Sequence, residues 1–215
     1  MASVQILGFA PSTFTRTARM ACEEKGVPYD LIQVPPHSPE VLAIHPFGKI
    51  PALRHGDFEL CESKAIAEYI DRSFEGPALF PSDPRERARA EQWVSMVNTV
   101  MDPVMIRTYV FGYFFPKTED GSPNRAAIDG VLPALKQQIA ILDKAVAPTG
   151  CVAGGSFSFA DINLMVILYY VKMFPEGAEA LASARSLAAY YERNARRPSF
   201  KNTIPPPPPA RQAKG

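Results

Sequence analysis

A serine and a threonine stand together where a predicted strand meets a predicted helix. Ser12 and Thr13 follow the apolar run 4–8 and precede a helical pattern. The N-terminus of a helix has free N–H groups and favours an anion, to which a hydroxyl could donate a hydrogen bond. No His and Asp occur at a spacing that would deprotonate Ser12, so we expect a donor rather than a nucleophile. An ordinary helix N-cap is the alternative role for Ser12, and Thr13 is the alternative hydroxyl.

Residues 45–63 form a second group with chemical potential. Two short runs of alternating polarity flank Gly56 and Asp57, a pair that suits a tight hairpin turn. Pro51 lacks an N–H and therefore fits the start, edge or bend of a strand, and its peptide bond could be cis. Ser63 lies in the first turn of the following helical pattern, where an anion would be favoured.

This segment resembles the glutathione-binding segment of the cytosolic glutathione S-transferases. Their pattern is Asn-Pro-x-Gly-x-[Val/Ile]-Pro-x-Leu, then a hairpin, then Glu-Ser-x-Ala-Ile. Here the sequence reads His-Pro-Phe-Gly-Lys-Ile-Pro-Ala-Leu and later Glu-Ser-Lys-Ala-Ile, with His45 where Asn is usual. The region around Ser12 resembles serine-type, phi- or theta-like bacterial members. The resemblance spans residues 3–200 and implies a thioredoxin-like α/β N-terminal domain followed by an all-α C-terminal domain.

The resemblance also implies where glutathione, the co-substrate, would bind. The Ile50 backbone would pair with the cysteinyl part, as a strand added to a sheet edge. Glu62 and Ser63 would hold the ammonium and the carboxylate of the γ-glutamyl end. Lys49 and His37 could reach the glycyl carboxylate, although His37 could equally be an exposed loop residue. The expected glutathione-binding residues are His37, Lys49, Ile50, Pro51, Glu62 and Ser63, with no metal.

Thiol activation is the task that Ser12 would perform in such a site. A thiol with a pKa of about 8.5 is only a few per cent thiolate at neutral pH. Lowering that pKa by about two units requires roughly 2.7 kcal/mol of preferential thiolate stabilisation. A hydroxyl supplies part of it through a charge-assisted hydrogen bond, and the helix N-terminus or Arg16 could add to it. Arg16 could instead be a solvated or structural charge.

The expected reaction is attack of glutathione thiolate on small apolar electrophiles, with a role in detoxification. A glutathione-dependent peroxidase or dehalogenase is one alternative, because both reuse a serine-held thiolate. A non-catalytic protein that binds glutathione or a hydrophobic ligand is the other.

The electrophile pocket has two interpretations. Apolar and aromatic residues cluster on either side of Pro103, and such a stripe forms a core more often than a pocket. In the family this region faces the glutathione sulfur across the domain cleft. On that basis Met101, Met105 and Tyr109 are the candidate pocket residues.

The elements that must position these residues fall into two domains. Residues 1–74 have the order β-α-β-α-β-β-α, with a first helix over 15–26, and form the glutathione-binding domain. Residues 75–84 are rich in Pro, Gly and acidic side chains and form a linker. Residues 85–203 form the helical domain, and its predicted helices run from 85 through Pro103 to 115, over 126–146, from 162 and over 178–196. Ser158 and Asp161 have capping-box spacing. Residues 204–215 contain five consecutive prolines and are predicted to form an extended tail.

Composition limits the partners and the cellular location that we expect. The net charge of +1 gives no reason to expect nucleic acid or an acidic membrane as a partner. No apolar run reaches the roughly 18 residues of a spanning helix. The three cysteines do not form a disulfide framework, which favours a reducing, cytoplasmic location. We expect a homodimer from the resemblance.

Overall fold

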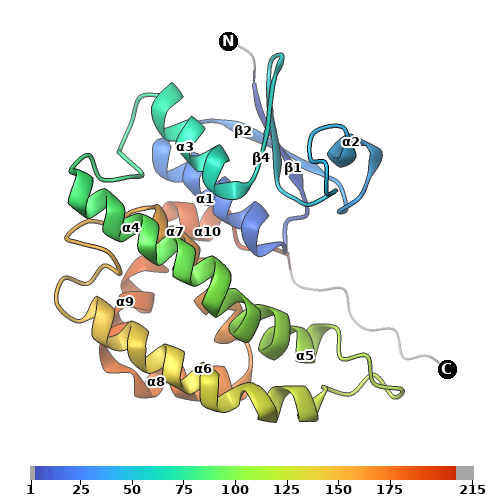
Figure 1. The fold of residues 1–215 in the computed structure, drawn as a ribbon, viewed down its shortest axis with the longest axis vertical. Coiled ribbons are helices and arrows are strands. Elements are labelled where there is room, and N and C mark those ends of the chain that lie inside the picture. Colours follow the sequence, from blue (N-terminus) through green and yellow to red (C-terminus); the bar gives the residue numbers. More distant parts are fainter. Residues whose placement is uncertain (1–2, 207–215) are drawn as a thin grey trace.

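A four-stranded mixed sheet lies at the amino-terminal end of the molecule (Figure 1). The structure, a computed structural model, describes residues 3–206. Its strands are β1 (Val4–Gly8), β2 (Tyr29–Gln33), β3 (Ala52–His55) and β4 (Phe58–Cys61), in the spatial order β2-β1-β3-β4. β2 runs parallel to β1, whereas β3 is antiparallel to both β1 and β4. The parallel pair needs a crossover connection, which α1 supplies.

Three helices accompany this sheet: α1 (Thr13–Lys25), α2 (Pro39–Leu42) and α3 (Ser63–Ser73). α1 and α3 pack against each other, and with the sheet they enclose fully buried side chains such as Ile6, Leu53 and Ile66. The order of elements is the β-α-β-α-β-β-α predicted from the sequence. α1 begins at Thr13 rather than at residue 15, because the Ser12 side chain caps its first turn.

A long helical rod crosses the molecule below the sheet (Figure 1). It consists of α4 (Pro84–Met96), the π-helical segments η1 (Val97–Met101) and η2 (Pro103–Val110), and α5 (Phe111–Phe114). The predicted continuation through Pro103 is therefore observed. The Asp102 N–H donates to the Val97 carbonyl, five residues back, so residues five apart lie on one side of this wider helix. The predicted linker lies between α3 and α4.

The remaining core is built around α7 (Phe159–Val171), which packs against α1 and is buried along nearly its whole length. Ser158 and Asp161 form the predicted capping box, with the Ser158 N–H 3.0 Å from the Asp161 carboxylate. α6 (Arg125–Val146) contains Pro133 in its interior. In the described residues, none of the helices is both long enough and apolar enough to cross a membrane.

The prediction of one helix over 178–196 is wrong. The chain instead forms α8 (Pro175–Ser183), α9 (Arg185–Asn194) and α10 (Pro198–Asn202). The backbone leaves helical geometry at Ala184, and the Leu187 N–H at the start of α9 is held by Asp143 of α6 at 2.8 Å. Apolar periodicity continues across Ala184, and the capping partner is distant in sequence, so the break was not visible in the pattern. Most of the predicted proline-rich tail, residues 207–215, lies outside the described residues.

Arg16 links the start of α1 to the carboxy-terminal helices. Its side chain is fully buried, with the guanidinium carbon 4.3 Å from the ring centroid of Tyr169 and 4.4 Å from that of Phe200. Its Nη2 donates to the Phe200 carbonyl at 3.1 Å, and its Nε donates to Thr203 Oγ1 at 3.4 Å. Burial, opposed by the neighbouring tyrosines, lowers the pKa of Arg16 to about 10. Arg16 is thus a structural cation, and its solvated interpretation is wrong.

A second charged group, Glu176, joins three helical segments. Its carboxylate accepts hydrogen bonds from the Tyr109 hydroxyl at 3.1 Å and from the Tyr113 hydroxyl at 2.6 Å. Arg125 forms an ion pair with it at 2.8 Å. Burial alone would raise the pKa of Glu176, but the hydrogen bonds from these partners lower it to about 2.

Replacing Arg16 should loosen the carboxy-terminal segment from α1. We expect Arg16→Ala to lower the free energy of unfolding by about 2–4 kcal/mol, because two stacked rings and two hydrogen bonds lose their partner. Amide hydrogen exchange should rise most in α10. The control is Arg196→Ala, which removes an exposed arginine close to the same helix. Unchanged exchange in α10 would contradict this role.

Glu176 should make stability depend on acidic pH. Its folded pKa is lower than the ordinary value of 4.5, so its contribution is complete above pH 4.5 and disappears as the pH falls toward 2. We expect Glu176→Gln to cost about 1–2 kcal/mol of unfolding free energy at pH 7. Urea titrations should show this difference shrinking between pH 4.5 and pH 2.5. A difference that stays constant across this range would refute the assignment.

Candidate active site

Ser12 occupies the corner between β1 and α1 and is partly exposed. Its N–H donates to the Phe9 carbonyl at 2.8 Å, and its carbonyl accepts the Arg16 N–H at 2.9 Å, so the backbone at this corner is fixed. The Ser12 hydroxyl oxygen accepts the Thr15 N–H at 3.3 Å, which is the N-cap role considered from the sequence. As an acceptor in that bond, the hydroxyl keeps its own proton for donation. The cap role and a donor role are therefore compatible in one side chain.

The alternative hydroxyls are less accessible than Ser12. Thr13 is 9% exposed, and Thr15 is fully buried against Gly8. Cys22 is also fully buried within α1, and burial raises the pKa of its thiol to about 12, so it is not a thiolate near neutral pH. Exposure thus favours Ser12 among the groups at this end of α1.

The hairpin segment presents backbone beside this corner. The Ile50–Pro51 peptide bond is cis, and β3 begins directly afterwards at Ala52. Pro51 is buried, whereas Ile50 is partly exposed just outside the first paired residue of the strand. The backbone at the end of β3 therefore includes a stretch outside the strand pairing, where an extended peptide could be added.

Glu62 and Ser63 stand at the beginning of α3. Glu62 has a φ of 74°, which is unusual for a residue with a side chain, and its carbonyl accepts the Ile66 N–H of the first turn. Its side chain is 70% exposed, with one oxygen 3.2 Å from the ring of His45. Ser63 is buried at the first helical position, where N–H groups without helical partners favour a carboxylate. Within one helical turn, Glu62 therefore offers a negative carboxylate, and the helix start at Ser63 offers partial positive charge.

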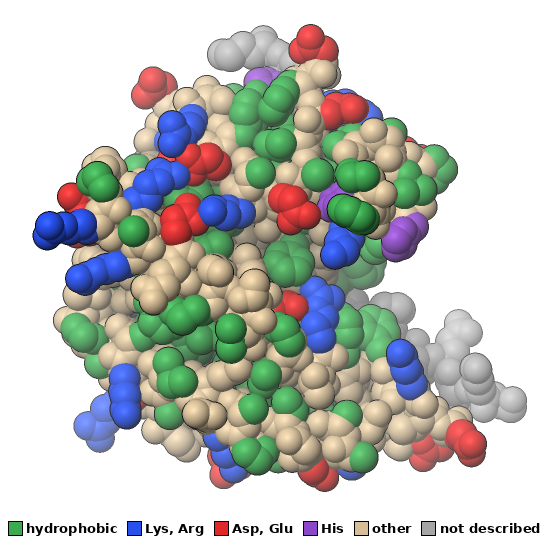
Figure 2. Space-filling view, in the orientation of Figure 1, with side chains coloured by type: hydrophobic (Ala, Val, Ile, Leu, Met, Phe, Trp, Pro, Cys, Tyr) green, Lys and Arg blue, Asp and Glu red, His purple; other side chains and the backbone are tan. Residues whose placement is uncertain are grey.

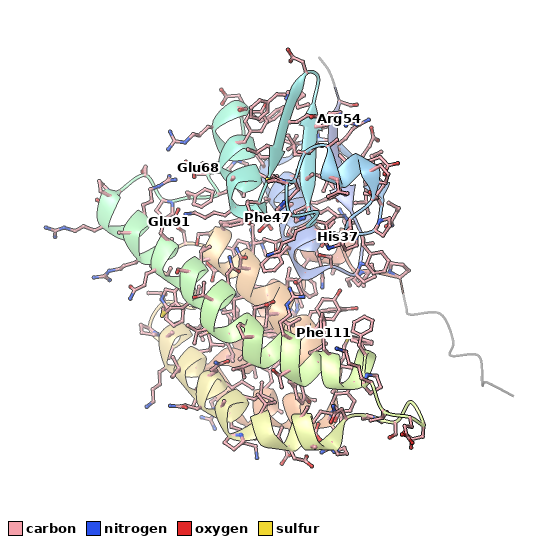
Figure 3. All side chains as sticks on the ribbon, turned by 45° about the vertical axis from the view of Figure 1, so that its right-hand side comes forward. His37, Phe47, Arg54, Glu68, Glu91 and Phe111 are labelled. Atoms are coloured by element: carbon pink, nitrogen blue, oxygen red, sulfur yellow. The ribbon has the colours of Figure 1, made fainter. Side chains whose placement is uncertain are left out.

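His37 and Lys49 lie on one loop surface. The His37 N–H donates to the Gly48 carbonyl at 2.8 Å, and both His37 and Lys49 are exposed. A Cβ at Gly48 would lie 2.3 Å from His37 Nδ1, so this close approach requires glycine. Figure 3 shows His37 and Phe47 along the edge that faces the helical part of the chain. The structure thus brings His37 against the loop that carries Lys49 and Ile50, and His45 of that loop lies 3.2 Å from Glu62, next to Ser63.

The helical rod contributes residues that the sequence interpretation did not select. Arg107 lies with its guanidinium carbon 5.7 Å from the ring of Phe14 in α1 and 5.1 Å from the ring of Phe111. Its Nε donates to Asp102 at 2.8 Å. Phe111 lies across from the loop that carries Phe47 in Figure 3. The surface is hollowed between the two parts of the molecule at the right of Figure 2. The sequence signal that could have identified this surface was a lone arginine, Arg107, four residues before Phe111.

The predicted pocket residues are buried. Met101 is 4% exposed, and Met105 and Tyr109 are fully buried. The Tyr109 hydroxyl also accepts the Gly177 N–H at 2.7 Å, and its burial raises its pKa. The structure therefore places these three residues in the helical core, the alternative considered from the sequence. In the part of the chain that the structure describes, no cluster of three or more His, Cys, Asp or Glu side chains could hold a metal ion.

Comparisons with known proteins agree with this arrangement. Residues 7–78 match the family model "Glutathione S-transferase, N-terminal domain", and residues 101–198 match "Glutathione S-transferase, C-terminal domain". A probable glutathione S-transferase of Nicotiana tabacum is 30% identical over 180 residues, covering 82% of this chain and 75% of the relative.

Solved structures give the same result. Glutathione transferase F7 from Populus trichocarpa is similar with a TM-score of 0.84 and 27% identity, over 93% of this chain and 97% of that one. A theta class glutathione S-transferase from Xanthomonas axonopodis pv. citri, solved with glutathione bound, has a TM-score of 0.80 and 28% identity, over 95% of this chain and 98% of that one. These matches confirm the predicted thioredoxin-like domain followed by a helical domain. The chain belongs to the glutathione S-transferase family.

Proposed function

We propose that this glutathione transferase activates the thiol of glutathione with the Ser12 hydroxyl and adds the thiolate to small apolar electrophiles. The observation that carries the proposal is the position of Ser12: partly exposed, at the N-terminus of α1, with a proton free to donate. The hydroxyl proton and the free N–H groups of the first turn both stabilise a sulfur anion in preference to a thiol. The thiolate then attacks the electrophilic carbon, and the electrophile's leaving group departs with the bonding pair.

The same proposal assigns the rest of the tripeptide. The Ile50 backbone pairs with the cysteinyl residue beside the cis Pro51 bond. Glu62 binds the γ-glutamyl ammonium, and Ser63 with the start of α3 binds the adjoining carboxylate. Lys49 and His37 bind the glycyl carboxylate. The negative Glu62 at one end of the proposed site and the positive Lys49 at the other would set the direction in which glutathione lies.

The electrophile is proposed to bind against Phe14, Arg107 and Phe111. Two aromatic rings supply apolar surface, while Nε of Arg107 is held by Asp102, and its side chain is 45% exposed. Met101, Met105 and Tyr109 support this wall from within the core. A guanidinium beside the thiolate would favour electrophiles whose addition complex carries negative charge.

We further propose a cytoplasmic homodimer with a role in detoxification. Phe47 is 72% exposed on the loop that carries the binding segment, which supports a covering partner at this edge. The two alternatives, a glutathione-dependent peroxidase or dehalogenase and a non-catalytic binding protein, are separated by substrate profiling and by turnover.

Removing the Ser12 hydroxyl should raise the pKa of bound glutathione. We expect Ser12→Ala and Ser12→Gly to raise it by about 1–2 units and to lower kcat roughly tenfold to a hundredfold, with little change in glutathione affinity. Ultraviolet titration of the bound thiolate measures the pKa directly. Gly is tolerated at an N-cap, so Ser12→Gly separates the lost donor from a lost cap.

The matched control for Ser12 is Thr13→Ala, which removes the adjacent buried hydroxyl and should leave the titration unchanged. A reversed pattern would assign the donor to Thr13. Retention of glutathione with no turnover in any protein, including wild type, would favour the non-catalytic alternative.

Replacing Arg107 should change electrophile use but not glutathione binding. We expect Arg107→Gln, combined with Asp102→Asn so that no buried carboxylate is left unpaired, to lower kcat/KM roughly tenfold for a nitro-substituted aryl chloride. A neutral alkyl halide should be affected much less. Arg89→Gln, an exposed arginine of α4, is the control. Equal losses with both electrophiles would contradict the proposed role of the guanidinium.

A further inference from the structure

His45 is a buried histidine whose two ring nitrogens both have partners. It precedes the binding loop and is 3% exposed. Nδ1 accepts the Phe47 N–H at 3.1 Å, and Nε2 lies 3.2 Å from Glu62 Oε1. These are the only two polar atoms of the side chain. Both are therefore engaged, Nδ1 with the loop and Nε2 with Glu62.

The partner at Nδ1 determines which nitrogen carries the proton. A backbone N–H can only donate, so Nδ1 must be unprotonated to accept it. The neutral ring therefore has its proton on Nε2 and donates it to the Glu62 carboxylate. The ring does not depend on Glu62 for its own position, because the His45 N–H donates to the Val41 carbonyl at 2.7 Å and the His45 carbonyl accepts the Gly48 N–H at 2.8 Å.

Glu62, in contrast, has little else to fix its side chain. It is 70% exposed, and its backbone is held in left-handed geometry at the start of α3. A carboxylate this exposed samples several rotamers, and a ligand that needs one of them must bear the cost of ordering it. A hydrogen bond from a rigid neighbour to Oε1 selects the rotamer in advance and leaves Oε2 available.

We propose that His45 is a positioning residue that orients Glu62 toward the γ-glutamyl ammonium of glutathione. The inference rests on the proposed role of Glu62 as the ammonium ligand. At position 45 this sequence has histidine where the family usually has asparagine, and the proposal gives that difference a consequence for glutathione binding. An asparagine oxygen can accept the N–H two residues ahead, but the side chain is too short to reach Glu62 as well.

The test separates the two hydrogen bonds of His45. His45→Asn keeps an acceptor for the Phe47 N–H and removes the donor to Glu62. Calorimetry should show roughly three- to tenfold weaker binding of glutathione, as expected for one hydrogen bond. Binding of glutaryl-cysteinylglycine, which lacks only the ammonium, should not change. At saturating glutathione kcat should be unchanged, so the effect appears in KM alone. His55→Asn, a hairpin histidine bonded to Tyr69, is the matched control and should bind glutathione like wild type.

The double variant checks whether His45 acts through Glu62. We expect Glu62→Gln to weaken glutathione binding more than His45→Asn, and His45→Asn to have no further effect in the Glu62→Gln background. Additive losses, or equal losses with glutathione and its desamino analogue, would overturn the positioning role. Wild-type binding by His45→Asn together with weakened binding by Glu62→Gln would overturn it too, while leaving the ammonium site intact. If Glu62→Gln binds glutathione normally, the proposed ammonium site itself fails.

A measurement on the unaltered protein covers the case in which His45→Asn does not fold. Nitrogen-15 correlation spectra of the histidine rings report which nitrogen carries the proton. The expected pattern for His45 is a protonated Nε2 with a slowly exchanging hydrogen and a bare Nδ1. A ring with its single proton on Nδ1 and a bare Nε2 could not donate to Glu62 and would overturn the proposal.

Discussion

The buried guanidinium of Arg16 is the constraint on which the geometry of the corner at Ser12, between β1 and α1, depends. A cation removed from water is costly, and here no carboxylate accompanies it within hydrogen-bonding distance among the described residues. Two aromatic faces, the Phe200 carbonyl and Thr203 Oγ1 take the place of part of the solvent. Arg16 lies one turn after Ser12, and the Tyr170 hydroxyl donates to the Pro11 carbonyl at 2.5 Å just before it. The helical part therefore holds the start of α1 on both sides of the proposed thiolate donor.

Local patterns predicted most of the sheet-containing part. Hairpin turn, capping serine and strand-helix-strand order depend on neighbouring residues, and these are visible in the sequence. The break between α8 and α9 depends on a distant partner, because Asp143 of α6 accepts the Leu187 N–H near the start of α9. For the same reason the sequence left Arg16 open between a solvated and a structural charge. Its burial is produced by Phe200 and Thr203, more than 180 positions away, and no local pattern carries that information.

The candidate site shows the same division between features set by neighbouring residues and features set by distant ones. The predicted glutathione-binding residues follow a compact motif, and hydrogen bonds link His37 to Gly48 and His45 to Glu62. The electrophile wall depends on how the helical rod winds. In an α-helix residues five apart diverge, but π-helical geometry around Pro103 sets Asp102 and Arg107 side by side. The family resemblance selects Met101, Met105 and Tyr109, which are buried in the core, and misses Arg107, which lies against Phe14.

His45 shows how an internal hydrogen bond can matter for binding without touching the ligand. The imidazole and the Glu62 carboxylate belong to separate elements, the loop before β3 and the start of α3. Bonding them to each other couples the position of the loop backbone, which would meet the cysteinyl residue, to that of the carboxylate, which would meet the ammonium. Because the cysteinyl residue and the ammonium of one ligand would then bind to a single prearranged unit, ordering that the ligand would otherwise impose would already be complete in the free protein. A histidine achieves this where a shorter amide cannot, since its two nitrogens lie far enough apart to reach both elements.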